Sequence, residues 1–307
     1  MAAGKQDRRR GVAVFCTALV LFAVAGCGRR AGPQDGGSRP VPVPERWRIV
    51  CGTPALAELV FALGGGERVV GISDYTVWPP EALAKPSIGG WVNPDRERLT
   101  MLRPDIILTQ GMHERLAAFA QDMGVRFHSV PLERFTDILE QMEAVGVLLG
   151  MPENGRALRA RVETGLAEVR DAVAAAPPRR VVMLFARPEG DMAALTAIGP
   201  GTYLNDLIEI AGGVNIFRDA HGDFPQISKE SLLMRQPEVI LELHAEPMTE
   251  ARRGKVMEDW QVFSTLPAVR DGRIVLLTDD FLLIPGPRMV LTAGRFARAI
   301  HPECFDE

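Results

Sequence analysis

Several aromatic residues fall in predicted loops and outside the periodic core patterns: Tyr75, Trp91, Phe224 and Phe281. Tyr75 and Phe281 follow apolar strands, Trp91 follows a Gly-Gly turn, and Phe224 precedes a short helix. Flat, rigid rings suit a large planar ligand such as a corrin or a porphyrin, because they lose little side-chain entropy on binding. The alternative is that the rings pack onto the core as lids. For Trp78, in the same loop as Tyr75, the two interpretations are equally supported.

The sequence lacks the residue patterns of catalysis and of metal binding. It contains no Gly-x-Ser-x-Gly elbow, no His-Glu-x-x-His and no phosphate-binding glycine loop after a strand. No two of the 5 histidines lie at helical spacing, which disfavours a compact zinc or manganese site. We therefore expect no catalytic residue, no bound metal and no cofactor. Two alternatives stay open: His221 as a haem ligand, and an anchored hydrolase that uses acids such as Asp74 or Asp280.

The composition is that of an ordinary globular protein. The chain has 307 residues, of which 47% are hydrophobic and 24% charged. This length suggests about two domains. The formal charge of −4 is spread along the chain without a basic face, which argues against nucleic acid as a partner. We expect a monomer that binds a small molecule.

The N-terminal segment is typical of an export signal. Basic residues precede the apolar run Gly11 to Gly26, which falls short of the roughly 20 residues needed to span a bilayer. The run ends in Val24-Ala25-Gly26-Cys27, which looks like a bacterial lipobox, where the cysteine thiol takes up lipid. We predict a signal peptide at 1–26, lipidation of Cys27 and a flexible tether at 27–46. The folded body would then be membrane-anchored outside the cytoplasm. An ordinary secretory signal with a chance cysteine is the alternative.

Two further cysteines lie in the body of the chain. Cys51 falls in the first apolar strand and Cys304 lies near the C-terminus. An oxidising compartment would permit a disulfide bond between them. Their positions in different halves favour two separate thiols, and both possibilities remain.

Short apolar runs alternate with helical patterns in residues 47–151 and again in residues 178–307. This alternation predicts two α/β lobes, each a mostly parallel sheet flanked by helices. The expected strands are Arg48–Gly52, Val69–Ser73, Asp105–Thr109, Val125–Val130, Arg180–Phe185, Val239–Leu243 and Arg273–Thr278. The expected helices are Pro54–Leu63, His113–Met123, Tyr203–Ala211, Lys229–Arg235 and Gly286–Ile300.

A long helix is predicted between the two lobes. Glu153 to Ala176 contains no proline, and its apolar residues recur every three or four positions until Pro177-Pro178. A hinge would carry Gly and Ser at this point. The segment 152–177 is therefore predicted to form a stiff helix between the lobes. A stiff connection would keep the cleft between the lobes at a nearly fixed geometry.

An internal repeat supports the division into two lobes. The segment Asp95 to Leu108 matches Ser228 to Leu241, and the match places Glu97 opposite Glu230. In each copy a capping residue opens a short helix, a proline ends it, and a buried strand follows. Both glutamates are thus predicted in an exposed first helical turn. Acids suit a helix start in any case, but that preference alone does not explain the repetition.

Several segments of the sequence resemble those of a known protein family. The segments Thr53–Gly64, Gly71–Pro80 and Phe224–Glu230 resemble the periplasmic cobalamin-binding proteins of ABC importers. The segments Gly212–Phe217 and Pro285–Arg288 are also similar to the wider family that binds siderophores, haem and cobalamin. The resemblance extends from about Arg48 to Pro302. It implies a class III periplasmic binding protein, in which two α/β lobes are joined by one long rigid helix.

The resemblance also implies roles for individual residues. Tyr75, Trp91, Phe185, Phe224 and Asp280 match positions that contact cobalamin. Glu97 and Glu230 match the acids that dock onto arginines of the permease, one from each lobe, which is also consistent with how charge pairs guide encounter. We therefore expect a lipoprotein that delivers cobalamin or a related corrinoid to a permease and ATPase complex. A ferric siderophore or haem is the alternative ligand; for the siderophore, Arg187 and Arg288 are the obvious cationic candidates.

Overall fold

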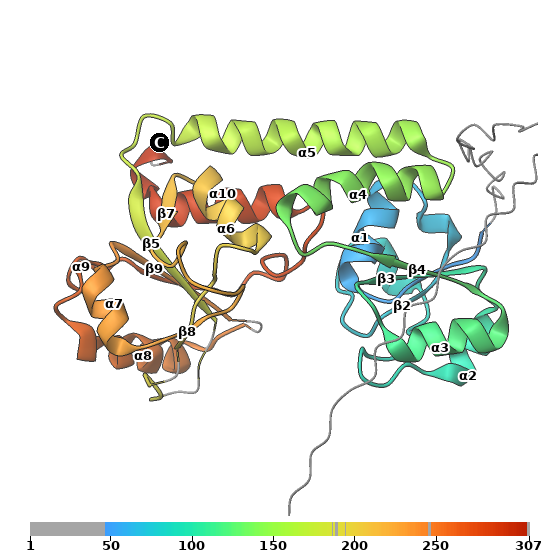
Figure 1. Cartoon of the computed structure of the whole chain (residues 1–307), viewed down its shortest axis with the longest axis horizontal. Helices are drawn as coiled ribbons and strands as arrows, with labels where there is room; N and C mark the ends of the chain where they lie inside the picture. Colours follow the sequence, from blue (N-terminus) through green and yellow to red (C-terminus); the bar gives the residue numbers. More distant parts are fainter. Residues whose placement is uncertain (1–46, 186, 188–189, 194, 245–246, 306–307) are drawn as a thin grey trace, which may run out of the picture. The chain divides into compact units, whose positions relative to one another are not determined.

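The computed structural model describes residues 47–305, apart from 186, 188–189, 194 and 245–246. The predicted signal peptide, the lipidation site Cys27 and the tether to residue 46 lie outside the described residues. The described body has two lobes, each with a parallel sheet flanked by helices (Figure 1), so the predicted α/β fold class is confirmed. Within this part of the chain, no helix is both long enough and apolar enough to cross a membrane.

The first lobe is built on a four-stranded parallel sheet in the order β2-β1-β3-β4. Its first strand is entirely buried, as expected for a sheet covered on both faces. The strands are β1 (Ile49–Cys51), β2 (Val69–Ile72), β3 (Ile106–Gln110) and β4 (Arg126–Val130). The helices are α1 (Pro54–Ala62), α2 (Arg96–Leu102), α3 (Glu114–Met123) and α4 (Phe135–Leu148), with short 3-10 turns η1 (Gly66–Arg68) and η2 (Pro80–Ala84).

The second lobe has a sheet of the same connectivity, in the order β10-β9-β5-β7, and also parallel. A small antiparallel pair, β6 with β8, lies beside it. The strands are β5 (Arg179–Phe185), β6 (Leu195–Thr196), β7 (Gly213–Asn215), β8 (Gln226–Ile227), β9 (Val239–Leu243) and β10 (Ile274–Leu277). The helices are α6 (Tyr203–Ile210), α7 (Lys229–Arg235), α8 (Glu250–Asp259), α9 (Pro267–Arg270) and α10 (Met289–Ile300), with the 3-10 turns η3 (Trp260–Phe263) and η4 (Pro302–Cys304).

The internal repeat is a repeat of structure as well as of sequence. The Asp95 carboxylate accepts a backbone hydrogen bond at the start of α2, and the Ser228 hydroxyl does the same for α7. The residue after each helix, Arg103 or Gln236, adopts the same left-handed conformation with φ 45°. The two helices therefore begin and end alike, which fixes equivalent surface positions on the two lobes.

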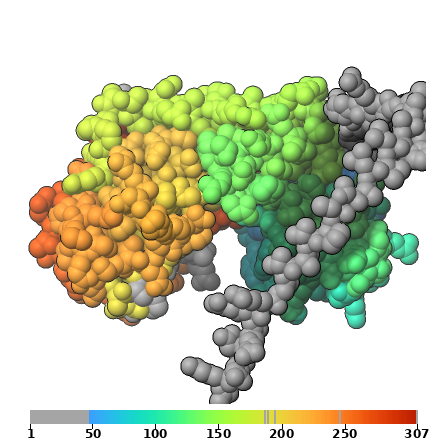
Figure 2. Space-filling model, in the orientation of Figure 1, coloured from blue at the N-terminus to red at the C-terminus, as the bar shows by residue number. Residues whose placement is uncertain are grey.

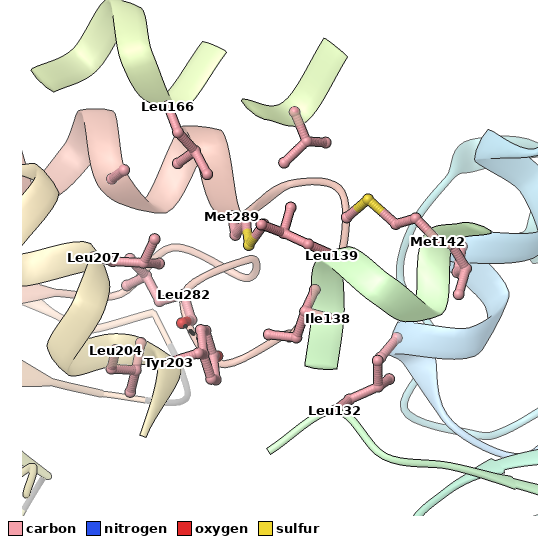
Figure 3. Close-up of a cluster of buried hydrophobic side chains, with 14 of the residues drawn as sticks. Leu132, Ile138, Leu139, Met142, Leu166, Tyr203, Leu204, Leu207, Leu282 and Met289 are labelled. Carbon is pink, nitrogen blue, oxygen red and sulfur yellow. Dashed lines mark hydrogen bonds between the residues drawn. The ribbon is translucent and has the colours of Figure 1, made fainter. Parts of the chain in front are cut away.

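The helix α5 (Pro152–Ala172) connects the lobes, as the periodicity predicts, but it ends before the predicted Ala176. It packs along α4 of the first lobe and along α10 and α6 of the second (Figure 1). Figure 3 shows side chains from all four of these helices meeting in one buried cluster. The cluster includes Leu139 and Met142 of α4, Leu166 of α5, Leu207 of α6 and Met289 of α10. The hydrophobic core is therefore continuous from one lobe to the other.

The close approach of α4 and α5 depends on two glycines, Gly146 and Gly155. A Cβ atom on Gly155 would lie 2.8 Å from the Met142 carbonyl oxygen, and one on Gly146 would lie 2.9 Å from the Gly155 Cα. Both contacts are with backbone atoms, which cannot rotate away. The crossing therefore requires hydrogen in place of a side chain at both positions.

We expect Gly155→Ala to destabilise the protein by about 1–3 kcal/mol, because overpacking outweighs the gain of up to about 1 kcal/mol in helix propensity. Thermal unfolding followed by circular dichroism measures this. The matched control is Gly254→Ala in α8, where a Cβ would meet nothing within 4 Å. That variant should be as stable as the wild type or more so. An equal change in melting temperature for both variants would contradict the close-packing argument.

Candidate functional site

A pocket of about 350 Å³ lies where the carboxyl ends of the two sheets face each other. The first lobe contributes Gln110 at the end of β3 and Glu133 just after β4, and the second contributes Phe185 at the end of β5. Figure 2 shows the surface hollowed between the lobes below α4. The full lining is Gln110, Leu132, Glu133, Phe185, Thr202, Tyr203, Leu204, Asp223, Phe224, Leu283 and Pro285. Ligands of open parallel sheets bind at such carboxyl ends, which makes this pocket the candidate site.

Two of the predicted ligand residues, Phe185 and Phe224, form an aromatic wall of this pocket. Their ring centroids are 5.4 Å apart and their planes are inclined at 59°. Phe185 is half-buried at the strand end, whereas 54% of the Phe224 surface is exposed. Phe224 therefore offers a ring face that is not used by packing. Contact of these rings with a ligand stays a prediction.

Two further predicted rings, Tyr75 and Trp91, lie in the first lobe and are not among the residues that line the pocket. Trp91 is 40% exposed and packs against His113, with ring centroids 4.3 Å apart. Tyr75 is 63% exposed, and its ring lies against Gly90, next to Trp91 in the chain. Both rings are thus exposed, in the segment between β2 and α2 that follows the carboxyl end of β2.

Asp280 and Phe281 belong to a cluster of charged and aromatic side chains around Arg288, which links the two lobes. The Arg288 guanidinium donates to Asp280 at 3.1 Å and, in a two-pronged contact at 2.6 and 3.0 Å, to Glu58 of α1. Its Cζ lies 5.3 Å from the centroid of the Trp78 ring and 5.7 Å from that of Phe281. Asp280 is therefore paired, although its side chain remains 50% exposed.

Glu58 is the member of this cluster that sequence reasoning missed. Its residue surface is 4% exposed, and burial raises the pKa of its carboxyl, with the hydrogen bond from Arg288 acting in the opposite direction. The signal was present: Glu58 interrupts the otherwise apolar helix Pro54–Ala62. An acid on a buried helix face requires a cationic partner.

The cationic residues proposed for an acidic siderophore are engaged elsewhere. Arg187 is 7% exposed and bonds Asp259 at 2.7 Å, with Glu242 at 3.8 Å, while Arg288 bonds Glu58 and Asp280. The described residues lining the pocket include two carboxylates, those of Glu133 and Asp223, and no lysine or arginine. The pocket is therefore electrostatically unfavourable for an anionic ligand.

The acids predicted for docking lie on the two equivalent helices. Glu97 and Glu230 both occupy the first turn and both are exposed. Hydrogen bonds from its own backbone N–H and from the Ser228 hydroxyl lower the pKa of the Glu230 carboxyl. Both surfaces are thus available to a partner, and docking itself stays a prediction.

The remaining sequence predictions concern thiols, metals and catalysis. Cys51 is buried and Cys304 is exposed, and both are free thiols, so the disulfide alternative is not formed. Within the described residues, no three or more His, Cys, Asp or Glu side chains are grouped so that they could hold a metal ion. Asp74 accepts a hydrogen bond from the Ser87 hydroxyl, and His221 is exposed in a loop outside the pocket lining.

Two parallel-sheet lobes with a pocket at their facing carboxyl ends have the architecture of a protein that binds a small molecule between its lobes. Residues 49–281 match the family model described as periplasmic binding protein, and the chain belongs to this family. Its members are substrate-binding proteins of transporters that work outside the cytoplasmic membrane.

Three similar proteins illustrate the range of the family. A vitamin B12-binding protein of Vibrio cholerae serotype O1 is 27% identical over 245 residues, covering 78% of this chain and 84% of that protein. The uncharacterized ABC transporter substrate-binding lipoprotein YvrC of Bacillus subtilis is 24% identical, covering 94% and 97%. The periplasmic heme-binding protein RhuT of Roseiflexus sp. RS-1 has a TM-score of 0.68 and 28% identity, covering 84% and 99%.

Proposed function

We propose that this chain is the substrate-binding lipoprotein of an ABC importer and that it captures cobalamin or a related corrinoid between its lobes. The observation that carries the choice of ligand is the charge of the pocket, where Glu133 and Asp223 lie beside the rings of Phe185 and Phe224. Haem carries propionates, and catecholate siderophores carry several negative charges. The rim of a corrin instead carries neutral primary amides, which donate hydrogen bonds to carboxylates.

The size of the pocket also bears on the proposal. Its volume of about 350 Å³ is smaller than a whole corrinoid. One edge of the ring would enter the pocket, and the rest would extend over exposed surface such as the rings of Tyr75 and Trp91. The similarity to vitamin B12-binding proteins agrees with this ligand. The similarity to a heme-binding protein makes haem the principal rival.

Calorimetry with cyanocobalamin, haemin and a ferric tricatecholate in parallel tests the choice of ligand. We expect binding of cyanocobalamin alone. The charge argument adds a second measurement on the variant Glu133→Gln with Asp223→Asn, which should improve the binding of haemin or tricatecholate relative to the wild type. Tight binding of haemin by the wild-type protein, with no binding of cyanocobalamin, would overturn the corrinoid proposal.

The aromatic wall gives a prediction for a single residue. Phe224→Ala should weaken ligand binding by roughly ten-fold, since an aromatic contact contributes about 0.5–1.5 kcal/mol in addition to the area that it buries. Because Phe224 is 54% exposed, the melting temperature should change little. Val262→Ala, at another exposed apolar position in the second lobe, is the control and should bind normally. Unchanged affinity for all three ligands would remove Phe224 from the site.

Lipid anchoring is proposed from the sequence pattern at Cys27, and the similarity to a substrate-binding lipoprotein agrees with it. We expect Cys27→Ser to prevent acylation and to leave a folded protein that is either unanchored or an unprocessed precursor. Metabolic labelling with a radioactive fatty acid, followed by membrane fractionation, measures both effects. Label incorporated into the Cys27→Ser variant at the wild-type level would contradict this assignment.

A further inference from the structure

The two most exposed large apolar side chains among the described residues are those of Met234, at 79%, and Met101, at 72%. They occupy equivalent positions in the internal repeat, one on α7 and the other on α2. Single exposed apolar residues are common on protein surfaces. These two methionines, however, are the most exposed large apolar residues of the described chain and occupy matching positions in the repeat. A single explanation should therefore account for both.

Each methionine lies beside one of the repeated glutamates. Met101 follows Glu97 by one helical turn, and Met234 follows Glu230 in the same way, so each pair shares a helix face. The opposite face of each helix is held in the core by a fully buried leucine, Leu99 or Leu232. Each lobe therefore presents a carboxylate next to a thioether, on helices whose two ends are fixed alike. We refer to these as the two Glu-Met patches.

The arginines of α2 and α7 are held in ion pairs with neighbouring acids. On α2, Arg96 pairs with Asp122 at 2.7 Å and Arg98 pairs with Asp95 at 3.1 Å. On α7, Arg235 pairs with Asp219 at 2.6 Å. For Glu97 and Glu230, no ion pair is formed with any described residue. Each patch thus combines exposed apolar surface with a carboxylate that forms no ion pair among the described residues; on α7 the adjacent Lys229 also attracts the Glu230 carboxylate.

We propose that the two Glu-Met patches form one bipartite docking surface for the importer permease, in which each methionine enters an apolar pocket next to the cation that receives its glutamate. This inference rests on the proposed function and extends it from charge pairing to apolar burial. A permease with two similar halves would offer the same contact twice, which matches the duplication on the lobes. Methionine suits the role, because its flexible, polarizable side chain adapts to two contacts that are similar but not identical.

The charges distinguish this partner from the other possible occupants. A second copy of this chain would bring two carboxylate patches together, and like charges in contact oppose association. An anionic lipid surface would repel both glutamates. A protein surface that carries cations beside apolar pockets complements both components of each patch, and we therefore assign the patches to the permease.

The test replaces both methionines with glutamine, which has similar length and helix propensity but no apolar end. In the source bacterium, the variant Met101→Gln with Met234→Gln should reduce uptake by about ten-fold or more at limiting ligand, because burial of the two side chains is lost. Uptake is measured with labelled cyanocobalamin, haemin and ferric tricatecholate, and the informative ligand is the one whose uptake requires this chain. Ligand affinity and melting temperature of the purified variant should equal those of the wild type.

Two companion variants identify the cause. Met101→Leu with Met234→Leu keeps the apolar surface and should retain uptake. Val147→Gln with Leu291→Gln removes two other exposed apolar side chains, 60% and 53% exposed on α4 and α10, and should also retain it.

The possible outcomes separate this inference from the function on which it rests. Normal uptake by the glutamine pair, together with failure of Glu97→Gln with Glu230→Gln, would leave docking in place and overturn the role of the methionines. A wild-type dimer in sedimentation that the glutamine pair dissociates would assign the patches to self-association and overturn it as well. If uptake of none of the three ligands requires this chain, the proposed function fails and the inference fails with it.

Discussion

Replacing both Glu97 and Glu230 with alanine is expected to abolish uptake while leaving ligand affinity unchanged. The two carboxylates lie on separate lobes, both exposed, at equivalent first-turn positions. Removing one partner of a hydrogen-bonded charge pair that docking buries costs about 2–5 kcal/mol, and here both contacts are lost together. The pocket lining includes neither residue, so binding should be normal. Uptake at limiting ligand, with calorimetry on the same variant, measures both expectations.

The control variant removes the same amount of charge from a different part of the surface. Glu140→Ala with Glu168→Ala removes two exposed acids from α4 and α5 and should transport normally. Arginine at positions 97 and 230 should be more damaging than alanine, because it adds repulsion to the loss of attraction. If the double alanine variant takes up ligand at the wild-type rate, the repeated acids act only as helix starts.

The repeat is the part of the structure that the sequence predicts in most detail. Matching Asp95 with Ser228 predicts two capped helices, and both side chains accept the expected hydrogen bond. Local signals of this kind depend only on neighbouring residues, which explains their success. The helix α4 had a usable signal in the spacing of Ile138, Met142 and Val145, but it was not recognised. The contact between Gly146 and Gly155 could not be predicted, because it depends on how two helices cross.

The candidate site is harder to predict from sequence, since its residues come from strand ends, loops and a helix that are far apart in the chain. The exposed rings of Trp91 and Phe224 could be identified from their loop positions. Phe185 came only from the family resemblance, because its place at the end of an apolar strand is equally typical of a core residue. The pairing of Arg288 with Glu58 was missed, because it joins α1 to a segment at the other end of the chain. A sequence shows that a buried acid needs a cation, but it does not show which cation.

We expect Arg288→Met to destabilise the protein by about 3–5 kcal/mol at neutral pH, since it leaves the buried Glu58 carboxylate without its cation. The side-chain surface of Arg288 is 12% exposed and that of Glu58 is 3% exposed, so water replaces little of the lost interaction. Arg295→Met, in the helix α10 that begins directly after Arg288, is the matched control. Its pair with Asp279 is about one-third exposed on both sides, and its loss should cost no more than about 1 kcal/mol. Denaturant unfolding gives both free energies.

The pH dependence identifies Glu58 as the cause. Burial already raises the pKa of the Glu58 carboxyl above its ordinary value, and losing Arg288 should raise it further. A carboxyl whose pKa is higher in the folded state lowers stability as the pH rises above its unfolded value of about 4.3, because the folded state resists ionisation. The deficit of Arg288→Met should therefore be smallest in acid and grow toward neutral pH. Adding Glu58→Gln should recover most of the lost stability and remove this pH dependence. A deficit that is equal at all pH values and is not reduced by Glu58→Gln would assign the effect to lost packing on Trp78 and Phe281.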